Sequence, residues 1–251
     1  MTLLAALLLF IAGFVSGAVN AVAGGGTFIT FGALTLVGLP PISANATSSI
    51  AQIPGYITST LAYWSDIKRI WRGVLVLAGV SIIGAFLGAI FLLMLDNPSF
   101  AAMVPWLLLA ATALFAAGPW LKPKPRETEA AAKGHSISGP IVQFLTAIYG
   151  GFFGAGMGIM MLATLGLTES GDYHRLNATK NFLSIVVAAV AIFVFASGGV
   201  VGWLQALVMV PAVALGGYSG VWAAKRVPQT AMRAFVVAVG LALAAYYFFR
   251  G

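Results

Sequence analysis

Long stretches of this chain contain no Asp, Glu, Lys or Arg, and each is long enough to cross a bilayer, which takes about 20 apolar residues as helix. They occupy residues 1–65, 73–95, 97–121, 134–168 and 181–224. Their length and the residues that interrupt them predict eight hydrophobic helical segments, at residues 3–22, 43–64, 73–95, 100–121, 138–165, 177–197, 203–224 and 229–249. We therefore predict an all-α polytopic membrane protein, multi-pass in the cell inner (plasma) membrane.

The composition agrees with a lipid environment. Hydrophobic residues make up 61% of the 251 residues and charged residues only 8%, whereas a soluble domain carries roughly a quarter charged residues because its surface faces water. The formal net charge of +7 comes from basic residues in short groups between apolar runs. Because these groups do not line one face, we predict the lipid bilayer and not nucleic acid as a partner.

One polar segment divides the chain nearly in half. Residues 122–137 hold prolines and charges that prevent a membrane helix, and their Lys and Arg residues place the segment in the cytoplasm, because basic loops stay inside. The predicted organisation is a first transmembrane repeat at 1–121, a cytoplasmic linker at 122–137 and a second transmembrane repeat at 138–251. Each repeat then holds about four hydrophobic helical segments.

The two halves share a motif. In the first half Gly24, Gly25 and Gly26 precede the run Asn45-Ala46-Thr47-Ser48-Ser49. In the second half Gly154, Gly156 and Gly158 precede the run Asn177-Ala178-Thr179-Lys180-Asn181. The Asn follows a glycine by 21 positions in both halves, and the copies lie at an offset of 132, although the pairs Gly38-Leu39 and Gly166-Leu167 require a local gap. We interpret the pattern as a duplication.

The basic residues also predict how the halves are oriented. The loop at 68–72 lies inside by its Lys and Arg residues, and Asp96 then faces outside. Lys225 and Arg226 also favour the inside, yet counting every segment as a full span puts them outside. A glycine-rich element within 134–168 that enters and returns would resolve this conflict and make the second half an inverted repeat of the first. Parallel halves with a two-charge violation are the alternative.

Glycine clusters at equivalent places predict broken helices, because irregular backbone at membrane depth persists only where protein buries it or a cavity wets it. Close helix packing through small residues is the alternative. The Asn-Ala-Thr tracts indicate helix starts, whose free amides and partial positive charge bind oxyanions, with plain capping as the alternative. The predicted substrate-binding residues are Asn45, Thr47, Ser48, Ser49, Gln52, Asn177, Thr179, Lys180, Asn181, Gly24, Gly25, Gly26, Gly154, Gly156 and Gly158.

Lys180 is the basic residue inside the repeated motif, where the first half has Ser48. A cation within a membrane is costly and therefore constitutes a functional hypothesis. We predict that Lys180 binds the anion. The alternatives are extension of the side chain to the membrane interface and neutralisation by Asp172 or Glu169.

The residues that enzymes and metal sites need are scarce in this sequence. The chain has no cysteine and two histidines, and no carboxylate lies inside an apolar segment. A thiolate or carboxylate metal site and an acid–base pair therefore lack members. We predict no enzymatic activity, no catalytic residue, no metal and no cofactor, and no proton coupling through a buried carboxylate.

Taken together, these motifs resemble the TauE/SafE family of sulfite exporters, also called toluene sulfonate uptake permeases. The resemblance covers nearly the whole chain. It rests on Gly13-Phe14-Val15-Ser16-Gly17 before the triple glycine, on Ala46-Thr47-Ser48, and on Gly-Phe-Phe-Gly-Ala-Gly at 151–156. The second copy departs from the family pattern by carrying Thr179-Lys180 where Thr-Ser is common. The resemblance implies transport of sulfite, sulfoacetate, other organosulfonates or related sulfur compounds, in either direction.

We therefore predict a secondary transporter or facilitator that exports a small sulfur oxyanion through a site between the repeats. An interior-negative potential expels anions at about 2.3 kcal/mol per charge per 100 mV, so export needs no coupling ion. The alternatives are an ion-coupled importer of a sulfonate or other small anion, and a membrane scaffold or assembly factor that transports nothing. Asn45 and Thr47 are expected to face Asn177 and Thr179 across one cavity near mid-membrane. The oligomeric state stays open, with a homodimer among the options.

Overall fold

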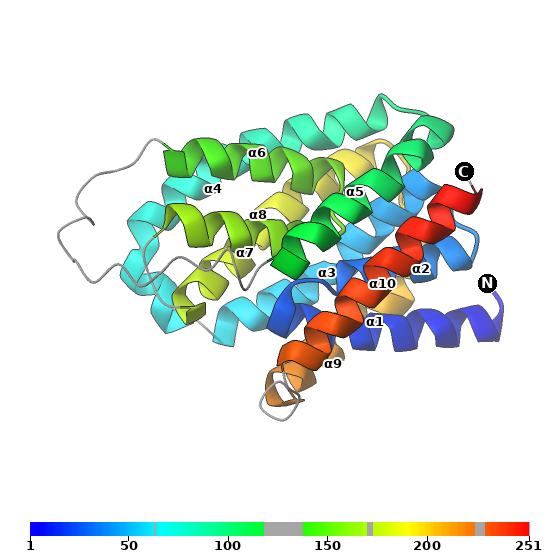
Figure 1. Ribbon diagram of the computed structural model, residues 1–251, viewed down its shortest axis with the longest axis horizontal. Coiled ribbons are helices and arrows are strands. Elements are labelled where there is room, and N and C mark those ends of the chain that lie inside the picture. The colour runs from blue at the N-terminus through cyan, green and yellow to red at the C-terminus, as the bar shows by residue number, and fades with distance from the viewer. Residues whose placement is uncertain (63, 118–137, 170–172, 224–228, 251) are drawn as a thin grey trace.

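The computed structural model describes residues 1–62, 64–117, 138–169, 173–223 and 229–250. These residues form ten α-helices and no strand. Figure 1 shows the helices as one bundle in which most run along the long axis of the molecule. They are α1 (Leu3–Ala23), α2 (Thr27–Leu36), α3 (Pro41–Ala62), α4 (Trp64–Leu93), α5 (Asn97–Ala117), α6 (Ser138–Phe152), α7 (Met157–Thr168), α8 (Tyr173–Ser197), α9 (Trp203–Ala223) and α10 (Gln229–Arg250).

The all-α prediction is confirmed, but the division into eight hydrophobic segments is wrong in two places. The segment predicted at 138–165 is two helices, α6 and α7. Residues 27–36, where the hydrophobic pattern predicted no segment, form the short helix α2. The start of α4 lies at Trp64 rather than at residue 73, and the start of α8 at Tyr173 rather than at residue 177, because polar residues at these ends are helical without being apolar.

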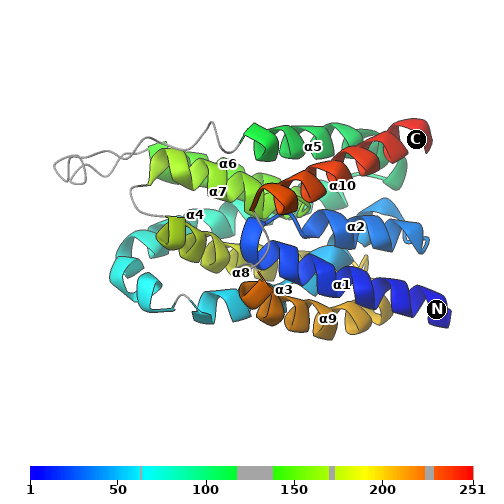
Figure 2. The same cartoon turned by 60° about the horizontal axis from the view of Figure 1, so that its bottom comes forward.

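The helix breaks lie at glycines with left-handed backbone. Gly24 and Gly156 both have φ of +81°, a conformation that strains any residue with a Cβ atom. Figure 2 shows α2 turning back toward the end at which α1 begins. Figure 1 shows α7 turning back in the same way toward the end at which α6 begins. The predicted broken helices are therefore present in both halves.

The helices repeat at the predicted offset of 132. The starts of α5 and α10, at Asn97 and Gln229, are separated by this offset, and so are the starts of α3 and α8 and the ends of α2 and α7. The expected local gap between Gly38-Leu39 and Gly166-Leu167 is wrong. Gly38 follows the end of α2, whereas Gly166 lies inside α7, so the two pairs are not equivalent.

Repeat-related contacts also join the two halves. α1 packs against α9, and its counterpart α6 packs against α4. Gly84 and Gly88 of α4 lie against the backbone of α6, and their counterparts at the repeat offset, Gly216 and Gly220 of α9, lie against α1. Small residues let membrane helices approach this closely. α3 also packs against α8 and α5 against α10, so each of these helices contacts its own repeat counterpart in the other half.

The outside of the bundle suits a multi-pass membrane protein. Within the described residues, α1, α4, α5, α8 and α9 are long and apolar enough to cross a membrane, and α2, α7 and most of α10 are shorter apolar helices. Large apolar side chains point outward, among them Leu3, Phe193 and Phe249. α3 instead carries buried polar side chains along its length and is covered by α8 and α9.

The two chain ends lie at the same end of the bundle, and α6 begins at the opposite end from α1 (Figure 1). An inverted repeat would have this arrangement, but the orientation of the halves in a membrane stays a prediction, as do the three domain boundaries. The linker at 122–137 and the pair at 225–226 lie outside the described residues. The loop predicted at 68–72 is wrong, because these residues are helical and lie within α4. Lys68 is exposed there, with Nζ 5.8 Å from the centre of the Trp64 ring.

Candidate functional site

The two helix breaks are in direct contact. Gly24 and Gly158 approach so closely that a Cβ atom on either would come within 3.0 Å of the other's backbone. The Gly156 amide donates to Thr27 Oγ1 at 2.9 Å. Backbone from both halves therefore meets where each half interrupts a helix.

Most of the predicted glycines also have a packing role. A Cβ atom on Gly25 would meet Val236, and one on Gly26 would meet the Ser16 carbonyl oxygen. A Cβ atom on Gly154 would come within 2.5 Å of Ser49 Oγ. The close-packing alternative therefore accounts for the absence of side chains at these positions, whatever the backbone does for a substrate.

Asn45 ties α3 to the break in the second half. Its Nδ2 donates to the Phe152 carbonyl oxygen at 3.0 Å, and its Oδ1 accepts from the Gly154 amide at 3.2 Å. A helix that ends leaves such carbonyls and amides without partners. The side-chain amide of Asn45 therefore stabilises the interrupted backbone between α6 and α7 from the opposite half.

A buried hydrogen-bond network fills the first half around the α1–α2 break. Ser48 Oγ lies 2.6 Å from Thr30 Oγ1, and Gln52 Nε2 donates to Thr30 Oγ1 at 3.3 Å and also to Ser16 Oγ. Ser16 Oγ donates to the Gly26 carbonyl at 2.6 Å, and Asn20 Nδ2 donates to Gln52 Oε1 at 3.2 Å. The predicted residues Ser48 and Gln52 therefore belong to one network whose groups bind one another.

The motif threonines and Ser49 bind helix backbone, but of these three only Thr47 does so at a helix start. Thr47 Oγ1 accepts from the Gly202 amide at 2.9 Å, next to the start of α9. Thr179 Oγ1 donates to the Arg175 carbonyl at 3.0 Å within α8, and Ser49 Oγ donates to the Asn45 carbonyl at 3.0 Å within α3. The predicted meeting of the two motifs across one cavity stays a prediction.

The second half differs because three of its motif side chains have a buried polar atom without a partner among the described residues. Lys180 is 0% exposed, and among the described residues its Nζ has no hydrogen-bond partner. Asn177 Oδ1 and Asn181 Nδ2 are also buried and without partners in this part of the chain. The spacing of these three residues places them on one face of α8. Glu169 is described but forms no hydrogen bond with Lys180 Nζ, and Asp172 lies outside the described residues.

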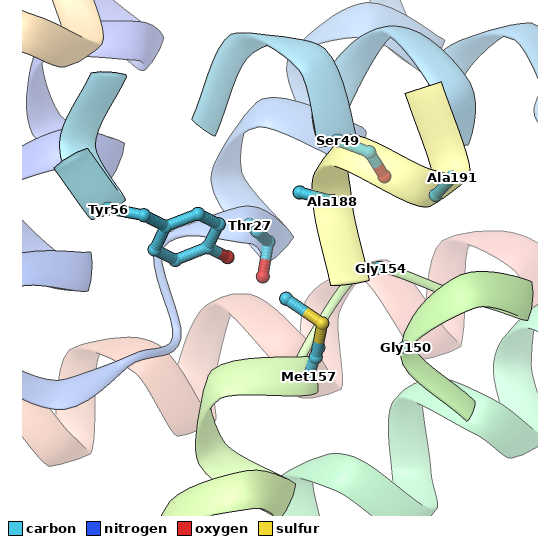
Figure 3. Close-up of a pocket in the computed structure, with 8 residues that line it drawn as sticks. All are labelled: Thr27, Ser49, Tyr56, Gly150, Gly154, Met157, Ala188 and Ala191. Carbon is cyan, nitrogen blue, oxygen red and sulfur yellow. The ribbon is translucent and has the colours of Figure 1, made fainter. Parts of the chain in front are cut away.

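A small pocket lies between the two breaks and the central helices. Figure 3 shows the Tyr56 and Thr27 hydroxyls directed toward the space beside Met157, with the Ser49 hydroxyl on the α3 side. Of the predicted site residues, Ser49 and Gly154 line this pocket and the others do not. The lining residues are Thr27, Ser49, Tyr56, Gly150, Gly154, Met157, Ala188 and Ala191.

Several polar residues of this region were missed by the sequence prediction. Thr27 and Thr30 lie on α2, which the hydrophobic pattern did not predict. Asn20 and Tyr56 are buried, and Asn20 Oδ1 and the Tyr56 hydroxyl have no hydrogen-bond partner in the described part of the chain. The signal that could have identified Asn20 is that it is the one Asn inside the hydrophobic segment predicted at 3–22. Among the described residues there is no group of three His, Asp or Glu side chains that could hold a metal ion.

Comparison with known proteins supports a transport role. The chain belongs to the family described as sulfite exporter TauE/SafE, which it matches over residues 9–247. A protein of Haemophilus influenzae named "Probable membrane transporter protein" is 28% identical over 249 residues, covering 95% of this chain and 92% of that protein. "Probable membrane transporter protein ORF9" of Sinorhizobium sp is 30% identical over 243 residues, covering 94% and 89%. "Probable membrane transporter protein YfcA" of Escherichia coli K12 is 26% identical over 251 residues, covering 94% and 87%. Family and relatives thus indicate membrane transport, a role that is not enzymatic.

Proposed function

We propose that this member of the family transports a small sulfur-containing anion, such as sulfite, sulfoacetate or another organosulfonate, out of the cell through a site between the two repeats. The observation that carries the proposal is Lys180, a fully buried cation whose Nζ has no hydrogen-bond partner among the described residues. An anionic oxygen is the chemical group that such a side chain lacks.

The free-energy cost of burying the Lys180 ammonium without a partner favours binding of an anion beside it. A buried charge without a partner costs several kcal/mol by order of magnitude, and such groups in membrane proteins mark the pathways of substrates and ions. Asn181 Nδ2 on the same face of α8 is a second donor without a partner in the described structure. An oxyanion accepting from both groups would satisfy them together, and sulfite and sulfonate groups carry several acceptor oxygens.

The contact between the halves supports a site that both repeats share. α3 and α8, which carry the two motifs, pack against each other, and the two helix breaks touch at Gly24 and Gly158. Broken helices of inverted repeats form the substrate sites of many secondary transporters near mid-membrane. Movement of one repeat against the other would then change which side of the membrane reaches Lys180.

Export follows from the charge of the substrate. With an interior-negative potential, each negative charge gains about 2.3 kcal/mol per 100 mV on leaving the cell, so no second ion is needed. An ion-coupled importer is the second candidate within transport. A scaffold or assembly factor would leave the buried cation of α8 without a role.

Flux measurements on the purified protein in liposomes test the proposal. We expect sulfite, sulfoacetate or thiosulfate to move in protein-containing liposomes, faster when the potential drives anions outward. The same compounds should raise the melting temperature of the detergent-purified protein, since a ligand of the native state stabilises it. Flux that occurs only with an imposed proton or sodium gradient would favour the importer. No flux and no thermal shift with any of these anions would overturn the proposal in favour of the scaffold.

A further inference from the structure

Asn45 holds the α6–α7 break of the second half by two hydrogen bonds, and we call this pair of bonds a clamp. The repeat predicts an equivalent pair of bonds on the α1–α2 break of the first half. Asn45 binds the Phe152 carbonyl and the Gly154 amide, one acceptor and one donor of the interrupted helix. At the repeat offset, Asn45 corresponds to Asn177. The two left-handed glycines are related by the same offset and share a φ of +81°, so the repeat register holds at the breaks themselves.

The register identifies what Asn177 would bind. The counterpart of the Phe152 carbonyl is the carbonyl of Asn20, and the counterpart of the Gly154 amide is the amide of Val22. The bond from the Val22 amide is not made in this structure, because Asn177 Oδ1 is buried without a partner among the described residues. Asn45 and Asn177 therefore occupy equivalent positions of the repeat, but among the described residues the Oδ1 atom of Asn45 accepts a hydrogen bond and that of Asn177 does not.

The two breaks differ in the same sense as the two Asn side chains: the break opposite Asn45 is open, and the break opposite Asn177 is closed. α1 continues to Ala23, and the Gly24 amide donates to the Asn20 carbonyl at 3.3 Å, so the break is closed on its own helix. α6 ends at Phe152, and the Gly156 amide donates across to Thr27 instead. One break is thus extended and clamped by the opposite half, while the other is closed on its own helix.

We propose that Asn45 and Asn177 are alternating positioning residues, each holding the break of the opposite half in one of two transport states. In the second state α1 ends near Asn20, Asn177 binds the released backbone of residues 20 and 22, and Asn45 releases the second half. The same number of clamp hydrogen bonds is made in both states, so the two states differ little in free energy. This inference rests on the proposed transport function only in requiring two states.

Substitution of the two residues then has opposite effects. Asn45→Ala removes two hydrogen bonds from the state described here and none from the other. Asn177→Ala removes no hydrogen bond of Oδ1 from the state described here, because that atom has no partner among the described residues, and it destabilises the second state. Each substitution should change the ratio of the two states about 30-fold, in opposite directions, because this is the factor in an equilibrium constant that two hydrogen bonds of ordinary strength give together.

Cysteine labelling measures the ratio, because the chain contains no cysteine. Thr60 lies near the end of α3, buried and with its hydroxyl unpartnered among the described residues, and its repeat counterpart Ile192 lies on α8. α3 and α8 end at opposite ends of the bundle (Figure 1). A single cysteine at each position is labelled with a membrane-impermeant maleimide in vesicles of both orientations, in the background of Asn45→Ala, of Asn177→Ala and of the unchanged chain.

We expect Asn45→Ala and Asn177→Ala to move the ratio of labelling at the two reporters in opposite directions, and the double variant to return toward the unchanged chain. Thr58→Val is the matched control, because the Thr58 hydroxyl donates to the Pro54 and Gly55 carbonyls of α3 itself, and it should leave the ratio as it is. Shifts in the same direction, or no shift with Asn177→Ala, would overturn the proposal. If Asn45→Ala does not fold, the comparison of the labelling ratios of Asn177→Ala and the unchanged chain tests the proposal. The thermal shift that sulfite induces in the same variants separates the two proposals. If sulfite causes no thermal shift but the labelling ratios still move in opposite directions, the proposed substrate is wrong and the alternating roles of Asn45 and Asn177 stand.

Discussion

Replacement of Lys180 by Met tests the site most directly, because it changes binding and stability in opposite directions. Met has nearly the length of Lys and no charge, so the packing of α8 is kept. In this structure the Nζ atom is fully buried without a hydrogen-bond partner among the described residues. Lys180→Met removes this unfavourable group and should raise the melting temperature of the protein without ligand.

The size of both effects follows from the burial of Lys180. An unsatisfied buried polar group costs about 1–3 kcal/mol, and about 1 kcal/mol changes the melting temperature of a chain of this size by roughly 2–4 °C. A hydrogen bond to a charged group contributes about 1.5–3 kcal/mol. Loss of that bond corresponds to roughly 10- to 150-fold weaker binding of the anion.

Thermal unfolding with increasing sulfite or sulfonate measures both quantities on one sample. Lys68→Met is the matched control, because the same substitution at an exposed lysine beside Trp64 removes one charge without touching the site. We expect the control to bind like the unchanged protein. A Lys180→Met protein that melts lower than the unchanged chain and binds the anion equally well would refute both the stability argument and the role of Lys180.

Three further outcomes are expected. Thr47→Val leaves the Gly202 amide without its acceptor, which should lower stability by about 1–3 kcal/mol in thermal unfolding and weaken anion binding far less than Lys180→Met. Gly88→Ala places a Cβ atom against the backbone of α6 and should reduce folded protein in detergent extracts, whereas Gly79→Ala, with nothing within 4 Å, should not. A reporter fused after Arg250 should be active outside the cell if the halves are inverted; activity inside would favour parallel halves.

Much of the fold could be predicted from the sequence because membrane helices are recognisable by length and polarity. The repeat offset, read from glycines and two Asn-Ala-Thr tracts, holds for the helices and for the glycine contacts between α4 and α9 and their partners. The break within 134–168 was predictable because one helix of that length would exceed the membrane. Residues 27–36 escaped prediction since a helix this short cannot span a bilayer.

The candidate site was less predictable because hydrogen-bond partners depend on tertiary structure. The motif placed Asn45 and Thr47 together, and each was expected to face a substrate. In the fold, Asn45 binds the break of the other half and Thr47 binds the start of α9, both far away in sequence. Anion binding by Lys180 stays a prediction, and in the fold its Nζ is buried without a hydrogen-bond partner among the described residues.

The two repeats differ at the positions that carry the proposed anion site. Ser48 and Thr30 form a hydroxyl pair in the first half, and at the repeat offset these positions are Lys180 and Leu162 in the second. The substitution of a hydroxyl by Leu removes the acceptor just where the other position gains a charge, so the second half cannot close its own network. The glycine contacts of α4 with α6 and of α9 with α1 are equivalent in the two repeats. If Lys180 binds the proposed anion, a second cation at the position of Ser48 would compete for the same ligand, which would account for the different polar side chains of the two repeats.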